Sequence, residues 1–218
     1  MTRIYLVRHG RTALNAAGVL RGHLDPELDA VGLRQASVLG DLLGRHELGL
    51  VVSSPLKRAV QTAQGIAFRA GLEVEIDPRL IDRDYGSWAG EGKEAVIAQY
   101  GSLNAAPGVE PEPDVLTRAM EALTEACRRV EGGSAVVVSH DALNGLLLAA
   151  LHPQLGESTV VIQDTGCFNV LAFDDQRWSV LSMNNAPAGH ESPPPRDEQI
   201  ESPSEPGPQP TSEDTDHG

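Results

Sequence analysis

Cysteine and long apolar runs are both scarce in this sequence of 218 residues. The two cysteines, Cys127 and Cys167, are too few for a disulfide framework, and we expect both to be small buried apolar side chains. No apolar run reaches the length that a membrane span requires. The first residues also lack the pattern of a signal peptide, because Arg3 is followed by an apolar run of only four residues and then by more charge. These absences predict a soluble, cytoplasmic protein that has no membrane partner.

Positive charge is also in short supply. The chain has 17 Lys and Arg residues against 31 Asp and Glu residues, and its formal net charge is -14. Half of that charge lies in residues 191–218, which contain eight acidic residues and one basic residue. The remaining acidic body lacks the broad basic face that nucleic-acid binding needs, so we expect no nucleic-acid partner. A local basic pocket in such a body would select small anions over large polyanions.

The composition changes after Asn185. Residues 186–218 hold eight of the fifteen prolines and almost no large apolar side chain. Such a segment cannot bury enough apolar surface to offset the entropy lost on ordering. We therefore expect one folded domain over residues 1–185 and a disordered, acidic, proline-rich tail over residues 186–218.

Within the expected domain, short apolar segments alternate with amphipathic ones. Strands are expected at residues 3–8, 50–53, 73–77, 135–138, 160–162, 167–173 and 178–183. Helices are expected after the N-cap Asp29 to about residue 46, after Ser54-Pro55 to about residue 70, and at residues 91–100, 114–131 and 144–151. The alternation over residues 3–151 is typical of an α/β fold, a three-layer sandwich in which a mostly parallel sheet is flanked by helices. The β-branched run at 135–138 indicates a central strand.

Polar side chains follow four of these strands. They are Arg8-His9-Gly10, Ser53 to Arg58, Asp82-Arg83-Asp84 and Ser139-His140-Asp141. Each segment alone is typical of a solvated loop. In a parallel sheet, however, the carboxyl ends of the strands meet at one edge, where open α/β sheets bind their ligands. Arginines beside histidines at such an edge favour an anion, of which phosphate is the commonest.

Five blocks of this sequence, in order, resemble the histidine phosphatase superfamily, which is also called phosphoglycerate mutase-like. The blocks are Leu6-Val7-Arg8-His9-Gly10 with Thr12 and Asn15, Arg21-Gly22 with Leu28 and Gly32-Leu33-Arg34-Gln35-Ala36, Ser53-Ser54-Pro55 with Arg58-Ala59 and Gln61-Thr62-Ala63, Asp84-Tyr85-Gly86-Ser87-Trp88-Ala89-Gly90, and Val137-Val138-Ser139-His140. The resemblance spans about residues 3–183 and leaves out the tail. Arg-His-Gly alone would be a weak signal, but the ordered series is specific.

The resemblance implies a phosphoglycerate mutase-like fold and a reaction through a phosphohistidine. His9 would be the nucleophile that attacks phosphorus, and Gly10 would let the backbone turn closely past the ligand. The phosphoryl oxygens and the substrate would be held by the donors Arg8, Asn15, Arg21, Arg58 and His140. A carboxylic acid would protonate the leaving oxygen and then help a water molecule attack the phosphohistidine. Neither a metal nor another cofactor is expected, because the seven histidines are scattered and neither cysteine is paired with one.

Two carboxyl groups compete for the role of proton donor. Members related to the mutases usually have Glu in a Leu-x-Glu setting, whereas Leu80-Ile81-Asp82 has the shorter Asp. The second histidine is commonly followed by Gly, but here Asp141 follows His140, and such a pair resembles the acid-phosphatase branch, where the aspartate is the donor. The surrounding loop favours Asp82. Asp141 remains the alternative, with a helix N-cap as its ordinary role, and Asp84 is a weaker third candidate.

The interval between the acid-bearing loop and the next long helix favours hydrolysis over phosphoryl transfer. The mutases of the family carry an additional insertion there, whereas the interval in this sequence, residues 90–114, is short and rich in Gly and Pro. A shorter cap leaves a phosphohistidine open to water, so we expect a phosphatase that acts on a small phosphomonoester. Two alternatives stay open: mutase-type phosphoryl transfer, and a catalytically weak phosphate-binding module.

Overall fold

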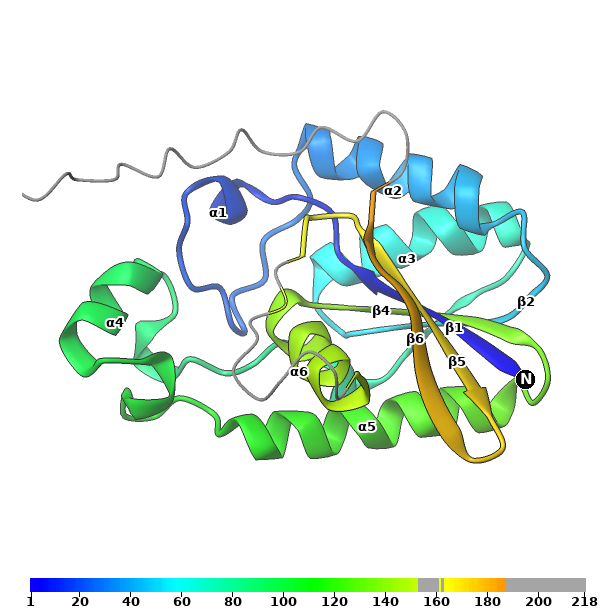
Figure 1. Cartoon of the computed structure of the whole chain (residues 1–218). Coiled ribbons are helices and arrows are strands. Elements are labelled where there is room, and N and C mark those ends of the chain that lie inside the picture. The colour runs from blue at the N-terminus through cyan, green and yellow to red at the C-terminus, as the bar shows by residue number, and fades with distance from the viewer. Residues whose placement is uncertain (153–160, 162, 187–218) are drawn as a thin grey trace, which may run out of the picture.

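A computed structural model describes residues 1–152, 161 and 163–186 of the chain (Figure 1). In this part of the chain, six strands form one sheet in the order β3-β2-β4-β1-β5-β6. The strands are β1 (Thr2–Arg8), β2 (Leu48–Ser53), β3 (Val74–Ile76), β4 (Ser134–Ser139), β5 (Phe168–Asp174) and β6 (Arg177–Asn185). The pairs β1–β4, β2–β4 and β2–β3 are parallel, and β5 and β6 join the β1 edge as antiparallel strands. The prediction of a mostly parallel sheet with 135–138 as a central strand is confirmed.

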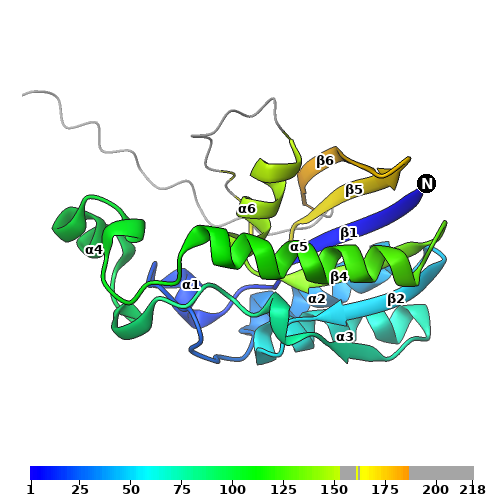
Figure 2. The same cartoon turned by 90° about the horizontal axis from the view of Figure 1, so that it is seen from below.

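Helices cover both faces of the sheet and extend past one of its ends. They are α1 (Ala13–Ala16), α2 (Ala30–Leu43), α3 (Lys57–Ala70), α4 (Lys93–Tyr100), α5 (Glu112–Arg129) and α6 (Asp141–Leu151). Helices α2 and α3 lie on one face and α5 and α6 on the other, so the fold is the predicted three-layer sandwich (Figures 1 and 2). Helices α1 and α4 lie beyond the carboxyl end of β1 (Figure 1). None of the helices in the described ranges is both long and apolar enough to span a bilayer.

The alternation of side chains along β1 explains why the sheet is buried on both faces. Ile4 and Leu6 pack in the cluster that includes α5 and α6, whereas Tyr5 and Val7 pack in the cluster that includes α2 and α3. Successive side chains of a strand point to opposite faces, so a strand covered on both sides must be apolar throughout. The run Ile4 to Val7 meets that requirement. Arg8 follows as the last residue of β1, at the carboxyl edge of the sheet.

Helix α2 begins where the sequence predicts and ends earlier than predicted. The Asp29 side chain accepts from the backbone N–H groups of Val31 and Gly32 at 2.8 and 2.9 Å, as expected of an N-cap. Val31, Ala36, Leu39 and Leu43 are buried on the face toward the sheet, whereas Leu33 is 53% exposed. The helix ends at Leu43 because Gly44 follows as its C-cap, earlier than the predicted end near residue 46.

Four other helices begin at positions that differ from the prediction, and for α4 and α5 the difference is two residues. Helix α3 begins at Lys57 rather than directly after Ser54-Pro55, and its N-cap Leu56 makes no side-chain capping bond. Helix α6 begins at Asp141 rather than Asn144, so the second histidine motif leads directly into a helix. Local signals set such boundaries only to within a few residues, and tertiary contacts decide the rest.

Two predicted segments lie mainly outside the described residues. The strand expected at 160–162 is represented by Val161 alone, which is not in a strand, and only residue 186 of the expected tail is described. The final hairpin is described in full. It joins β5 to β6 through Asp175 and Gln176, whose φ angles of 45° and 62° allow a two-residue turn.

A small cap covers the carboxyl edge of the sheet. Leu20, from the long loop after β1, packs with Tyr85, Val96 and Ala106 in a separate buried cluster. Trp88 packs on Tyr100 at the edge of this cluster, and its indole N–H donates to the Pro107 carbonyl at 2.9 Å. The cap therefore joins the loop after β1 to the segment that follows Asp82.

Candidate active site

His9 follows β1 directly, and its side chain is fully buried. Its Nδ1 lies 2.7 Å from the Gly10 carbonyl oxygen, which only accepts, so Nδ1 carries the proton and Nε2 carries the lone pair. Burial lowers the pKa of His9 well below its ordinary value, and the positive charges of Arg58, Arg21 and Arg8 lower it further. His9 is therefore a neutral imidazole whose Nε2 carries the lone pair that a nucleophile needs.

The backbone after His9 is held by contacts between segments that are distant in the sequence. The Gly10 N–H donates to Thr62 Oγ1 at 3.0 Å, and the Thr62 hydroxyl donates in turn to the Arg58 carbonyl at 2.7 Å. A Cβ on Gly10 would lie 2.7 Å from the carbonyl oxygen of Gly32 on α2. The close approach that needs glycine at position 10 is thus an approach to α2, a reason that the sequence alone did not supply.

Arg58 joins the two sides of the site. It lies in the first turn of α3 and is fully buried. Its donors reach His9 Nε2 at 3.3 Å, Asp82 Oδ2 at 3.0 Å, and the carbonyl oxygens of Leu24 at 2.6 Å and Gly22 at 3.0 Å. A guanidinium has five N–H groups, so one N–H on Nη1 has no acceptor within the described ranges. That N–H can donate to a bound anion.

His140 lies next to His9 and is also fully buried, with the two ring centroids 5.1 Å apart. Its Nε2 and the Ser54 hydroxyl are 2.7 Å apart, whereas its Nδ1 makes no hydrogen bond within the described part of the chain. Nδ1 lies 3.8 Å from Asp82 Oδ2. Burial lowers the pKa of His140 well below its ordinary value, and Arg58 lowers it further. Ser54, which the sequence suggested only as a helix-start signal, positions this ring.

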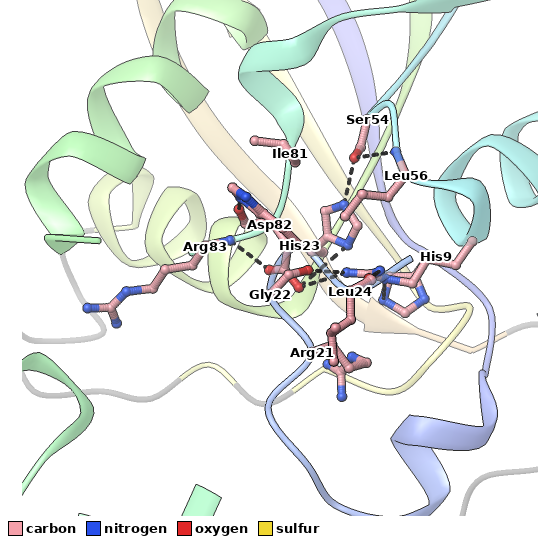
Figure 3. A network of polar contacts seen from close by, with 12 residues as sticks. His9, Arg21, Gly22, His23, Leu24, Ser54, Leu56, Ile81, Asp82 and Arg83 are labelled. Carbon is pink, nitrogen blue, oxygen red and sulfur yellow. Dashed lines mark hydrogen bonds and ion pairs between the residues drawn. The ribbon is translucent and has the colours of Figure 1, made fainter. Parts of the chain in front are cut away.

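Asp82 is 2% exposed and contacts the same guanidinium of Arg58 that reaches His9. Its Oδ1 accepts the backbone N–H of Arg83 at 2.9 Å, and its Oδ2 accepts Nη2 of Arg58 (Figure 3). Burial raises the pKa of Asp82 above its ordinary value, although Arg58 and Arg21 act in the other direction. A carboxyl group in this environment retains its proton to higher pH than a solvated one.

Asp141 occupies a different environment. It is the first residue of α6, its side chain is 43% exposed, and its Oδ1 lies 3.7 Å from Nη1 of Arg8, too far for a hydrogen bond. Arg8 is buried, and its Nη1 donates to the Gln163 carbonyl. Its Nε has no hydrogen-bond partner in the part of the chain that is described. The structure thus brings both candidate carboxyl groups to the site, Asp82 on Arg58 and Asp141 on Arg8.

Asn15 and Arg21 come from the loop between β1 and α2. The Asn15 side-chain oxygen accepts the N–H and the hydroxyl of Thr12 at 3.0 and 2.8 Å, which caps α1 and leaves its amide N–H groups as donors. Arg21 makes one long contact, 3.4 Å to the Val19 carbonyl, and its buried Nε has no partner among the described residues. Its charge acts on the pKa values of both His9 and Asp82. Arg21 therefore borders the site with unused donor capacity.

No group of three or more His, Cys, Asp or Glu side chains within the described ranges is arranged to hold a metal ion. The polar groups that meet at this edge are instead cationic or neutral donors with one buried carboxyl. Such a set suits an anion with several oxygens, and it offers a nucleophile and a proton donor on either side of Arg58.

Comparison with known proteins agrees with this geometry. The model of the family described as histidine phosphatase superfamily (branch 1) matches residues 4–186. The chain belongs to this superfamily. Phosphoserine phosphatase 1 of Hydrogenobacter thermophilus is 32% identical over 196 residues, which cover 84% of this chain and 92% of that protein. Glucosyl-3-phosphoglycerate phosphatase of Mycobacterium tuberculosis is 34% identical over 166 residues, which cover 68% and 74%.

A solved structure has the same fold. Mycobacterial glucosyl-3-phosphoglycerate phosphatase complexed with VO3 superposes with a TM-score of 0.74 at 28% identity, over 84% of this chain and 98% of that one. The phosphoglycerate mutase-like architecture that the sequence predicts is therefore confirmed. Relatives named as phosphatases also support the prediction of a phosphoric monoester hydrolase.

This histidine phosphatase brings most of its predicted site residues together at one edge of the sheet. His9, Arg58, Asp82 and His140 form a contiguous buried group. Arg8, Arg21 and Asp141 border this group, whereas the Asn15 side chain contacts Thr12 at the start of α1. Sequence reasoning missed the roles of Ser54 and Thr62. Both lie inside the block Ser53 to Ala63 that carries the family resemblance, which was the only signal that could have pointed to them.

Proposed function

We propose that this histidine phosphatase hydrolyses small phosphomonoesters in two steps through a phosphohistidine on His9. The observation that carries the proposal is the state of the His9 ring. Nδ1–H is bound to the Gly10 carbonyl, and the lone pair of Nε2 faces Arg58 inside a buried cationic site. A neutral imidazole can attack phosphorus once the bound phosphate takes the place of the Arg58 N–H at Nε2, and the nearby positive charges stabilise the oxygens of the transferring group.

In the first step, Nε2 of His9 forms a bond to phosphorus as the bond from phosphorus to the ester oxygen breaks. The leaving oxygen takes a proton from a carboxylic acid, and the alcohol departs. In the second step, the resulting carboxylate accepts a proton from water, whose oxygen attacks phosphorus and displaces His9. Inorganic phosphate leaves, and the enzyme regains both its neutral histidine and its acid. Arg8, Arg58 and His140 hold the phosphoryl oxygens, with Asn15 as a further donor.

We assign the proton donor to Asp82. Its burial and its raised pKa favour the protonated form, and its contact with Arg58 places it beside the same cation that touches His9. Asp141 is the less favoured candidate, because it is half-exposed and faces Arg8. Asp84 is weaker still, since its Oδ1 accepts the Gly86 N–H at 2.8 Å in a turn of the cap.

The substrate class follows from the unused donors of Arg21. Relatives are named for phosphoserine and for glucosyl-3-phosphoglycerate, and both compounds carry a carboxylate near the phosphate. Arg21 borders the site, and its Nε has no partner among the described residues. We therefore propose a small phosphorylated carboxylic acid, with its phosphate on Arg8 and Arg58 and its carboxylate on Arg21. We also propose that the histidine phosphatase domain comprises residues 1–185, since all of the proposed catalytic and binding residues lie within it.

A direct test uses p-nitrophenyl phosphate with a chelator present. We expect hydrolysis that survives the chelator and is lost in His9→Ala. With a substrate radiolabelled in its phosphoryl group, the wild type should retain an acid-labile label as the phosphohistidine. Binding of phosphate without turnover of any ester would favour the weak phosphate-binding module instead.

A second assay separates hydrolysis from mutase-type transfer. The wild type is supplied with 3-phosphoglycerate, and the products are followed over time. Release of inorganic phosphate is the expected outcome. Rapid formation of 2-phosphoglycerate with little free phosphate would make phosphoryl transfer the main activity and overturn the proposal.

A further inference from the structure

An arginine behind the acid-bearing loop has all of its donors occupied. Arg118 lies on α5, and its side chain is 18% exposed. Its five N–H groups have five acceptors: Glu110 Oε1 at 2.8 Å, Glu110 Oε2 at 2.9 Å, and the carbonyl oxygens of Arg79 at 2.7 Å, Ile81 at 2.6 Å and Asp82 at 3.2 Å. Three of these acceptors belong to the backbone of the loop that ends in Asp82. No side chain other than arginine offers five donors in one rigid fork.

Glu110 holds the other end of the same loop. Its Oε2 accepts the backbone N–H of Asp84 at 3.0 Å, and its own N–H donates to the Asp84 carbonyl at 2.8 Å. Its carbonyl accepts Nε of Arg83 at 2.8 Å, which explains why Arg83 is only 4% exposed. Arg118 therefore hydrogen-bonds to the backbone from Arg79 to Asp82, and Glu110, its ion-pair partner, hydrogen-bonds to the backbone of Asp84.

Helix α5, which carries Arg118, packs in the hydrophobic core. Val115, Ala119 and Leu123 of α5 are fully buried in the cluster that covers one face of the sheet, so the helix that carries Arg118 has a fixed position. Arg118 contacts only the backbone carbonyl of Asp82, whereas Arg58 contacts its carboxyl group. The two arginines therefore have separate tasks: Arg58 binds the acid, and Arg118 sets the path of the chain that presents it.

We propose that Arg118 and Glu110 are positioning residues for the proton donor, an inference that rests on the proposed function with Asp82 as the acid. A general acid works only within hydrogen-bond reach of the leaving oxygen, and a displacement of about 1 Å can cost about a hundredfold in rate. Aspartate is one methylene shorter than glutamate, so its reach depends more closely on where its backbone lies. The hydrogen bonds from Arg118 to the backbone carbonyls of Arg79, Ile81 and Asp82 fix the position of that backbone relative to α5.

The experiment measures two arginine variants, Arg118→Ala and Arg128→Ala, on two phosphate esters. Kinetics of Arg118→Ala are measured with 3-phosphoglycerate, whose alkoxide leaves poorly without a proton, and with p-nitrophenyl phosphate, whose phenolate leaves well. We expect kcat for the alkyl ester to fall by about 100-fold and that for the aryl ester by less than about 3-fold. Arg128→Ala is the matched control, because Arg128 lies on the same helix in an exposed ion pair with Glu125 and should leave both rates unchanged.

A double variant tests whether Arg118 acts through the acid. In an Asp82→Asn background, Arg118→Ala should cause no further loss with 3-phosphoglycerate. Equal losses for the two esters, or an additional loss in the Asp82→Asn background, would overturn the positioning role. If Arg118→Ala does not fold, Arg118→Lys serves, since its three donors cannot satisfy five acceptors and a selective loss of about tenfold is expected. Failure of the proposed function is a separate outcome, in which the wild type itself hydrolyses neither ester.

Discussion

The side chains of Arg58 and Asp82 are in direct contact in the protein interior, with Nη2 of the arginine 3.0 Å from Oδ2 of the aspartate and side-chain exposures of 0% and 3%. The same guanidinium donates from Nε to Nε2 of His9 at 3.3 Å. One cation therefore connects the proposed nucleophile to the proposed acid. Because opposite charge and burial act against each other on the carboxyl group, the pair also sets the proton affinity of the acid, and burial prevails.

Removing the acid should affect substrates according to their leaving groups. Asp82→Asn cannot donate a proton, so we expect kcat for 3-phosphoglycerate to fall by about 100-fold or more and kcat for p-nitrophenyl phosphate to change far less. Asp141→Asn is the matched variant, and it should keep both rates within about 3-fold. Steady-state kinetics of both variants on both esters decide the assignment. The reverse pattern, with the selective loss in Asp141→Asn, would make Asp141 the donor.

The pH dependence of kcat/KM should reflect the shifted groups. Asp82 must be protonated to donate, and burial raises its pKa, so activity on 3-phosphoglycerate should fall as pH rises through that raised pKa. His9 must be neutral to attack, and its pKa lies well below 6.5, so activity should persist when pH drops below 6.5. The measurement is a pair of pH profiles for the wild type and Asp82→Asn. Loss of activity at pH 6.5 on the acidic side would contradict the state assigned to His9.

Folding stability should also depend on pH through the two histidines. His9 and His140 have pKa values well below 6.5 in the folded protein, so the unfolded chain takes up protons that the folded chain does not. The stability from these groups is therefore present above pH 6.5 and is lost as pH falls toward the folded pKa values, by about 1.4 kcal/mol per pH unit and histidine. Urea unfolding at several pH values below 6.5 measures the slope. His140→Gln should reduce this slope by about 1.4 kcal/mol per pH unit, the contribution of one histidine, and an unchanged slope would contradict the prediction.

The hydroxyl of Ser54 should matter for catalysis although it bears no charge. It lies 2.7 Å from Nε2 of the buried His140 and holds that ring in place. A hydrogen bond of this kind is worth about 1 kcal/mol, so Ser54→Ala should lower kcat/KM for p-nitrophenyl phosphate by about 5- to 10-fold. Ser53→Ala is the control, because the neighbouring buried hydroxyl donates to the Ser54 carbonyl instead. Equal effects of the two substitutions would show that burial, not contact with His140, is what matters.

The arrangement of the layers could be predicted because it depends on patterns that any short window of sequence contains. Ile4 to Val7 and Ala135 to Val138 are apolar at every position, and only strands covered on both faces have that requirement. The convergence of Arg8, His9 and His140 then followed, because parallel strands deliver their carboxyl ends to one edge. The exact helix boundaries did not follow, since Ser54 bonds to His140 and does not cap α3.

The chemical type of the site was thus determined by the sequence itself, through the residues that follow its strands. Tertiary structure decided which of these residues act on one another. Asp82 and Asp141 are both short carboxyl side chains beside charged neighbours, but one is 2% exposed on Arg58 and the other is half-exposed near Arg8. Desolvation and hydrogen-bond distance separate the two, and both quantities arise only when segments distant in the chain pack together.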